Sequence, residues 1–167
     1  MQKVSELVGK SIVSAESGEQ LGKVADMLLD QQSQRVLAIV IEGGLFSSEH
    51  VLPLSDVQTL GKDAVVARSG TGVVGAKDWR QRTIEVVRTS RLKHKPVLTT
   101  SGRALGEIHD VLLDETGIVE GFEITGSRLG RVLGRHSLLP RANAVTVGAD
   151  AVIVSDESAA AIDPSRK

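Results

Sequence analysis

Two stretches of the sequence agree at more than half of their positions: Gly18-Glu-Gln-Leu-Gly-Lys-Val-Ala-Asp-Met-Leu-Leu-Asp30 and Gly102-Arg-Ala-Leu-Gly-Glu-Ile-His-Asp-Val-Leu-Leu-Asp114. They begin 84 residues apart in a chain of 167 residues, so each half of the chain holds one copy. Halves of this length suit two small domains, and the sequence predicts a tandem repeat. The residues that match are glycines, leucines and aspartates, which are typical of turns, core positions and turn starts. We therefore interpret the repeated stretch as scaffold and expect function where the copies differ.

The repeated stretch predicts a strand that continues into a hairpin. The second copy has the shorter loop, Asp114-Glu-Thr-Gly117, which is the form of a type I turn closed by a glycine with positive φ. Aligning the copies places Ile39 opposite Phe122, and we expect this pair in the core because apolar residues alternate around it. The same alignment places Val40 opposite Glu123, and we expect this position to reach water in both copies.

The remaining patterns complete two similar units of five or six short strands each. A turn with Leu7 or Leu92 opens each unit and is expected to fill the bottom of its own core. Short strands at a spacing of roughly 8 to 12 residues are typical of a small barrel or sandwich. The sequence thus predicts an all-β protein of two small β-barrels in tandem.

We expect domain boundaries where the repeats end. Residues 1–69 and 90–156 are the predicted barrels, and residues 70–89 are a linker with a short helix whose Trp79 packs between the domains. Residues 157–167 carry no further core pattern, and we expect this tail to fray.

The order of these features resembles the PRC-barrel family. The resemblance rests on Leu7-Val-Gly-Lys10, on Leu21-Gly-Lys-Val24 with Asp26, and on Leu52-Pro53, together with their counterparts in the second copy. This family includes the cytoplasmic domain of the H subunit of photosynthetic reaction centres and the C-terminal domain of a ribosome maturation factor. The chain resembles the small tandem proteins of the family more than either of these two. The resemblance implies PRC-type β-barrels and a docking or adaptor role.

Composition excludes several classes of function. Cysteine is absent, so disulfides, thiolate metal sites and a cysteine nucleophile are excluded. No apolar signal core opens the chain, and no run approaches the roughly 18 apolar residues of a membrane span, so we expect a cytoplasmic protein without a transmembrane segment.

No motif predicts catalysis, a cofactor or a metal. Gly70-Thr-Gly-Val-Val-Gly75 matches the dinucleotide-binding pattern, but the helix after it is too short for a βαβ unit, and we interpret it as a flexible linker. The pairs Asp26 with Asp30 and Asp110 with Asp114 lie too far apart on a strand for joint acid and base chemistry, and are interpreted as turn-starting residues. The four histidines show no metal-ligand spacing, although His50 and His136 occupy similar places before the prolines.

The charge distribution gives the best indication of a partner. Residues 80–103 carry seven basic side chains and one acidic side chain, whereas both flanks are acidic. We predict partner binding, or bonding between the two barrels, by the basic side chains of this segment and of a glycine-rich loop: Arg80, Arg82, Arg88, Arg91, Lys93, Lys95, Arg128, Arg131 and Arg135.

These observations favour a non-enzymatic protein-interaction or adaptor protein. The expected partner is another protein or complex, which could be membrane-associated or ribosomal, and exposed strand edges also allow self-association. The alternative is an RNA- or ribosome-associated factor that uses the basic linker. Nucleic acid is the less favoured partner because aromatic residues for base stacking are scarce and no RNA-binding motif is present.

Overall fold

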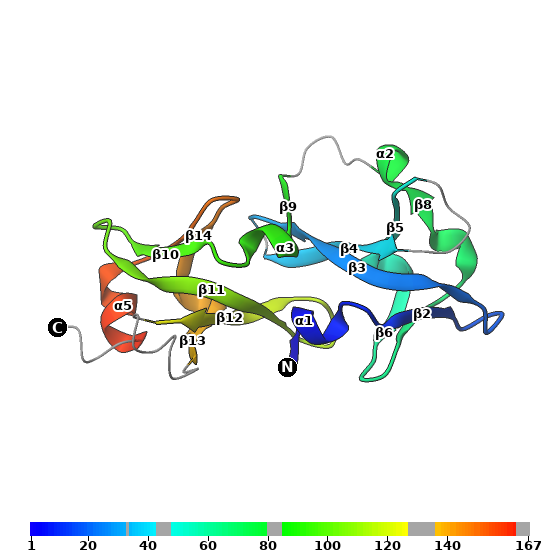
Figure 1. Ribbon diagram of the computed structural model, residues 1–167, viewed down its shortest axis with the longest axis horizontal. Coiled ribbons are helices and arrows are strands. Elements are labelled where there is room, and N and C mark those ends of the chain that lie inside the picture. The colour runs from blue at the N-terminus through cyan, green and yellow to red at the C-terminus, as the bar shows by residue number, and fades with distance from the viewer. Residues whose placement is uncertain (33, 43–47, 80–84, 127–135, 163–167) are drawn as a thin grey trace.

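The computed structural model contains two β-sheets that lie side by side along the long axis of the molecule (Figure 1). It describes residues 1–32, 34–42, 48–79, 85–126 and 136–162. The strands are β1 (Gln2–Lys3), β2 (Ser11–Ser14), β3 (Gln20–Asp30), β4 (Arg35–Glu42), β5 (His50–Pro53), β6 (Val57–Leu60), β7 (Val65–Ala67), β8 (Val74–Gly75), β9 (Val86–Arg88), β10 (Pro96–Thr99), β11 (Ala104–Leu113), β12 (Val119–Thr125), β13 (His136–Pro140), β14 (Ala144–Val147) and β15 (Val152–Val154). The all-β prediction is confirmed.

The helical segments are short. They are α1 (Val4–Leu7), η1 (Leu54–Asp56), η2 (Gly70–Gly72), α2 (Ala76–Trp79), α3 (Thr89–Leu92), η3 (Arg141–Asn143) and α5 (Asp156–Ile162). The predicted linker helix corresponds to α2. Among the described residues, no helix has the length and apolar character needed to cross a membrane.

The two sheets have the same strand order. The first sheet runs β6-β7-β2-β3-β4-β5-β8, and the second runs β13-β12-β11-β10-β15-β14, which is the same succession read from the other end with no counterpart of β8 among the described residues. We call the first sheet the first unit and the second sheet the second unit. Each helical turn is counted with the unit of its own repeat in the sequence, so α1 belongs to the first unit and α3 to the second. In each unit one pair of strands is parallel, β2 with β7 and β10 with β15, while the other pairs are antiparallel.

The central hairpin of each unit carries a β-bulge at the same place. In the first unit the register shifts between Val24 and Asp26, and in the second it shifts between Ile108 and Asp110. A bulge bends the strand and changes the direction of the next side chains. The bulge therefore presents Asp26 and Asp110 in equivalent positions.

The segments that begin the two repeats cross over to the opposite unit. Strand β1 pairs with β11 of the second sheet, and α1 contacts the same strand. Strand β9 pairs with β3 of the first sheet, and α3 contacts it. Leu7 and Leu92 are fully buried in these turns as expected, but the buried residues of both units form one continuous core cluster in place of two separate cores.

Two loops meet at the centre of the molecule and bond each other reciprocally. The amide of Val36 donates to the carbonyl of Gly117 at 2.9 Å, and the amide of Val119 donates to the carbonyl of Gln34 at 3.0 Å. Gly117 has a φ of 82° and Gln34 a φ of 50°, so both loops turn through the left-handed region. The predicted glycine-closed turn of the second copy is confirmed. These bonds relate the two units by an approximate two-fold axis.

The C-terminal segment does not fray as far as the structure describes it. Residues Asp156–Ile162 form α5, which contacts β13, and Ala159 is buried in the core. The Ser101 hydroxyl donates to the Asp156 carboxylate at 2.7 Å and anchors the first turn of this helix. The small apolar side chains of this segment allow close packing. The sequence prediction missed the helix because the segment is too short to show a hydrophobic pattern.

Candidate functional site

Asp26 is a buried carboxylate that holds the helical turn of the opposite unit. Thr89 Oγ1 donates to it at 2.7 Å, the Ser90 amide donates at 3.1 Å, and the Ser90 hydroxyl donates as well. The amide of Met27 completes the set at 2.8 Å. A carboxylate at the start of a helical turn satisfies amides that have no partner within the turn. Asp26 therefore joins the first sheet to α3.

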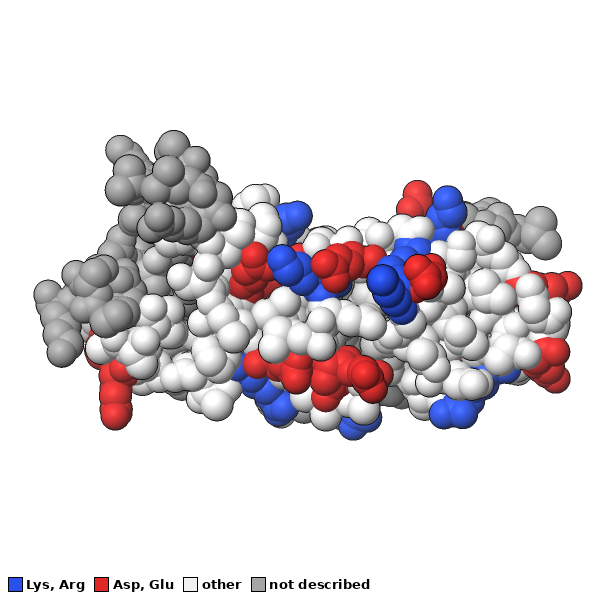
Figure 2. All heavy atoms as spheres, turned by 90° about the horizontal axis from the view of Figure 1, so that it is seen from below, with Lys and Arg blue, Asp and Glu red and all other residues white. Residues whose placement is uncertain are grey.

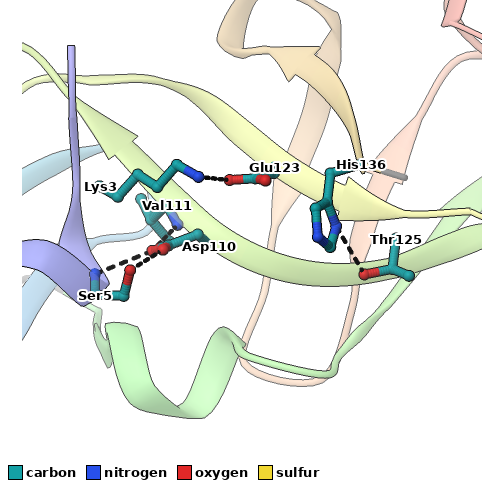
Figure 3. A network of polar contacts seen from close by, with 7 residues as sticks. All are labelled: Lys3, Ser5, Asp110, Val111, Glu123, Thr125 and His136. Atoms are coloured by element: carbon teal, nitrogen blue, oxygen red, sulfur yellow. Dashed lines mark hydrogen bonds and ion pairs between the residues drawn. The ribbon is translucent and has the colours of Figure 1, made fainter. Parts of the chain in front are cut away.

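Asp110 makes the equivalent connection in the other direction, as Figure 3 shows. The Ser5 amide donates to this carboxylate at 3.2 Å, together with the Ser5 hydroxyl, and the Val111 amide donates at 2.9 Å. The expectation that Asp26 and Asp110 start turns was wrong, because the bulge directs both carboxylates toward the opposite unit.

The other two matched aspartates do start turns. The Gln32 amide donates to Asp30 at 3.0 Å, and the Thr116 amide donates to Asp114 at 2.8 Å. Burial raises the pKa of Asp114, but hydrogen bonds from the Thr116 hydroxyl and from the amides of Ile118, Thr116 and Gly117 outweigh it and hold the pKa below its ordinary value. The turn-starting interpretation is confirmed for these residues.

A cavity of about 310 Å³ lies between the two crossed helical turns. Asp26, Asp110 and their serine partners line it, together with Lys93 and His109. Both serine hydroxyls donate to carboxylates, so neither is arranged as a nucleophile beside a histidine base. The carboxylates and serine hydroxyls of this cavity connect the two units.

The outer face of the first sheet is covered. Ala38, Val40 and Val51 are buried there beneath Val74, Ala76 and Trp79. Strand β8 pairs with the edge strand β5, so the segment also closes the edge of the sheet. Two expectations were wrong here: Trp79 packs on the first unit and not between domains, and Val40 is buried because this segment covers it.

On the second sheet, no described strand or helix covers the equivalent face as β8 and α2 do on the first. Strand β13 ends this sheet, and no described strand pairs with its other edge. Leu138, which occupies the place of Val51 in the strand register, is 48% exposed. A groove of about 360 Å³ runs along this face and is lined by Met1, Lys3, Glu6, Leu112, Glu123, His136, Ser137 and Leu138.

Lys3, Glu123 and His136 border this groove (Figure 3), and His109 lies beside His136. Lys3 Nζ lies 2.8 Å from Glu123 Oε2, and this hydrogen bond and its charge raise the pKa of Lys3. The rings of His109 and His136 stack with centroids 4.1 Å apart. His109, Glu123 and His136 each offer a ligand atom, and the three atoms lie within 4.8 Å of one another. The structure therefore brings together three residues that the sequence analysis did not join into a metal site.

The family comparison agrees with the duplicated architecture. The model of the PRC-barrel domain matches the chain twice, at residues 1–74 and 84–159. The chain belongs to the PRC-barrel family. Among curated proteins, none matches the chain significantly. The domain boundaries predicted at residues 69 and 90 stay a prediction, since β1, β9 and the two helical turns of this PRC-barrel pair are exchanged between the units.

The predicted basic site of the PRC-barrel pair is described only in part. Arg80, Arg82, Arg128, Arg131 and Arg135 lie outside the described residues. Arg88, in the crossed strand β9 of the first sheet, forms an ion pair with Glu49 of the same sheet's flank at 2.5 Å, and its role in partner binding stays a prediction. Arg91 and Lys93 are exposed on and after α3, and Lys95 is half-buried. Figure 2 shows basic and acidic side chains interleaved on the face that it presents.

The glycine-rich sequence of the linker is a structural segment of the first unit. Gly70–Gly72 form η2, and Gly75 lies in β8. A Cβ atom at Gly72 would lie 2.7 Å from Asp56 Cβ, so this glycine allows a close approach to an acidic side chain. Phosphate binding requires converging donors and not a carboxylate. The flexible-linker interpretation was wrong at η2 and β8, because this segment pairs with β5.

A comparison of the two copies could have revealed the cluster of His109, Glu123 and His136 from the sequence. The first copy has Ala25 and Val40 where the second has His109 and Glu123. At both positions a small or apolar residue is replaced by a side chain that can bind a metal ion. The sequence analysis placed His136 and His50 at similar positions, but the strand register differs by one residue. His50 pairs with Ile41, whereas His136 pairs with Thr125, the residue after the counterpart of Ile41. A shift of one residue moves a side chain to the opposite face of a strand.

Proposed function

We propose that this PRC-barrel pair is a protein-interaction module that binds an extended segment of a partner protein along the open edge of β13. The observation that carries the proposal is the difference between the two units. The edge of β5 is occupied by β8, whereas the matching edge of β13 has no strand partner among the described residues. Exposed strand edges pair readily with another strand.

The first unit supplies an internal example of such a complex. There Val74 pairs with Val51, and the side chains that follow β8 cover the outer face. In the second unit the same place offers Leu138, which is 48% exposed, and Met1, which is 70% exposed. A partner segment would place an apolar side chain over Leu138 and extend its backbone along β13.

The rim of the groove sets a second requirement for the partner. Lys3, Glu6 and Glu123 border the apolar floor, so charges of both signs surround it. An interface of this type has an apolar centre and a polar rim. We propose a partner segment with an apolar centre and polar side chains at both ends.

The role needs no chemistry by the protein itself, and we propose that it is an adaptor without enzymatic activity in the cytoplasm. The RNA-binding alternative has weaker support. Within the described part of the basic segment, Arg88 is engaged by Glu49, which leaves Arg91, Lys93 and Lys95 for a phosphate backbone.

The test compares three baits in quantitative affinity purification from the native cell. Leu138→Lys places a charge at the centre of the groove, and Val86→Lys makes the same change at another exposed apolar residue that is 38% exposed. We expect partners that bind the unmodified protein and the Val86→Lys variant but are lost from the Leu138→Lys variant. Recovery of the same partners on all three baits would show that the groove is not the docking surface.

A further inference from the structure

We propose that His109, Glu123 and His136 form a binding site for a divalent transition metal ion, with Zn²⁺ as the ion to test. The three residues come from neighbouring strands, β11, β12 and β13. Two imidazole nitrogens and one carboxylate oxygen are a ligand set that zinc accepts, with a fourth position for water. The site does not depend on the partner segment proposed above.

The geometry is close to that of a bound site. The three ligand atoms lie within 4.8 Å of one another. Two ligands of one tetrahedral zinc ion lie roughly 3.4 Å apart, given metal–ligand distances of about 2.1 Å. His136 is exposed and its ring can rotate, so a small movement closes the remaining gap.

A supporting residue orients one of the ligands. Thr125 Oγ1 lies 3.4 Å from His136 Nδ1, where it can accept the proton of that nitrogen (Figure 3). Nε2 is then the ring atom left to bind a metal. Histidine ligands in metal sites commonly donate their other ring nitrogen to such a partner.

The first unit shows that the fold does not need these side chains. The bulge places Ala25 where the second unit has His109, and the strand register places Val40 and Glu49 where it has Glu123 and His136. The same strands form in both units. The two histidines and the glutamate are therefore additions to the scaffold, gathered on one face.

Lys3 is the natural competitor for this site. Its ammonium group lies 2.8 Å from Glu123 Oε2, and a metal ion must share or displace it. Removal of this positive charge should strengthen metal binding by roughly thirtyfold, since two unit charges about 4 Å apart repel by about 1 kcal/mol in water and the metal ion carries two charges.

The experiment is a Zn²⁺ titration of the full chain, without an affinity tag and after treatment with a chelator, in competition with a chromogenic indicator. We expect one equivalent to bind and the thermal midpoint to rise. His109→Ala and Glu123→Val copy residues of the first unit, so they should leave the metal-free melting curve close to that of the unmodified protein. We expect each of them, and His136→Ala, to weaken binding at least about tenfold.

Two histidines outside the cluster serve as controls. His50→Ala and His94→Asn remove the same ring and should bind Zn²⁺ as the unmodified protein does; His94 has a φ of 68°, which asparagine tolerates. The proposal is overturned if the unmodified protein does not compete with the indicator, or if the control variants lose as much affinity as His109→Ala. Glu123 is not a ligand if Glu123→Val binds Zn²⁺ as tightly as the unmodified protein.

Discussion

At the scale of single residues, the aspartates at the two bulges hold the molecule together. Asp26 and Asp110 are 6% and 7% exposed, yet each carboxylate is satisfied by donors from the opposite unit and from its own strand. A buried charge without these donors would be strongly unfavourable. The pair therefore specifies how the two units fit.

Asp26→Ala should lower the free energy of unfolding by about 3 kcal/mol, because it leaves the Thr89 hydroxyl and the Ser90 amide without their charged acceptor. Asp110→Ala should cost about 2 kcal/mol, since fewer donors depend on it. Urea unfolding followed by circular dichroism measures both. Asp63→Ala changes an exposed aspartate and is the control; a loss for Asp26→Ala no larger than for this control would contradict the role assigned to the carboxylate.

The turn at Asp114 gives a prediction for pH. Its pKa is lowered in the folded protein, so the ionised side chain stabilises the fold above the ordinary aspartate pKa of about 3.9, and this contribution is lost as the pH falls through the folded pKa. Asp114→Ala should therefore destabilise the protein at neutral pH and much less in acid. NMR titration of the carboxyl group, in the folded protein and in urea, checks the direction; a folded pKa equal to or above that of the unfolded chain would contradict it.

At the scale of elements, the segment of β8 and α2 closes one unit and leaves the other open. Trp79 is the only tryptophan of the chain, and it covers the small apolar cluster of Ala38, Val40 and Val51. Its sequence neighbours pair with β5. The second unit has Gly121, Glu123 and Leu138 at the matching positions, so the two faces have different chemistry on one scaffold.

Trp79→Ala should destabilise the protein by about 2 kcal/mol and expose apolar surface, because the ring is only partly buried. Binding of a hydrophobic dye and thermal unfolding measure the change. Lys77→Ala, at an exposed position of the same helix, should leave both unchanged. Equal dye binding by the two variants would show that Trp79 does not cover the face.

Local sequence patterns predicted the strands and the core positions, but they did not predict contacts between residues that are far apart in the sequence. Ile39 and Phe122 were predicted in the core from the alternation of apolar residues around them, and both are fully buried. The role of Asp26 depends on Ser90, 64 residues away, and no periodicity encodes that pairing. The metal-ligand set likewise joins three strands, and only their register shows that His109 and His136 meet.

At the scale of the whole molecule, the two units are interlocked. Each receives a strand and a helical turn from the other repeat, and the core is continuous across them. The bond between Ser5 and Asp110 spans 105 residues of sequence. Such contacts form only when both units are present.

A protease site inserted within residues 80–84 provides a test of this interlocking. After cleavage, the two fragments should elute together from a gel-filtration column and keep the circular dichroism spectrum of the intact chain, because β1, β9, α1 and α3 still bind across. With Asp26→Ala and Asp110→Ala combined, the cleaved fragments should separate. Fragments of the unmodified sequence that separate while retaining native spectra would mean that each unit is self-sufficient.

The reciprocal loop bonds at the centre relate the two copies of the repeat as the subunits of a symmetric dimer are related. Contacts repeated about an approximate two-fold axis are those of a dimer of identical copies, in which every surface occurs twice. Once both copies share one chain, a change in one copy is no longer imposed on the other. Trp79 can then seal one face while Leu138 and His136 remain exposed on the other. Fusion thus allows the two faces of a symmetric assembly to differ, one covered and the other exposed.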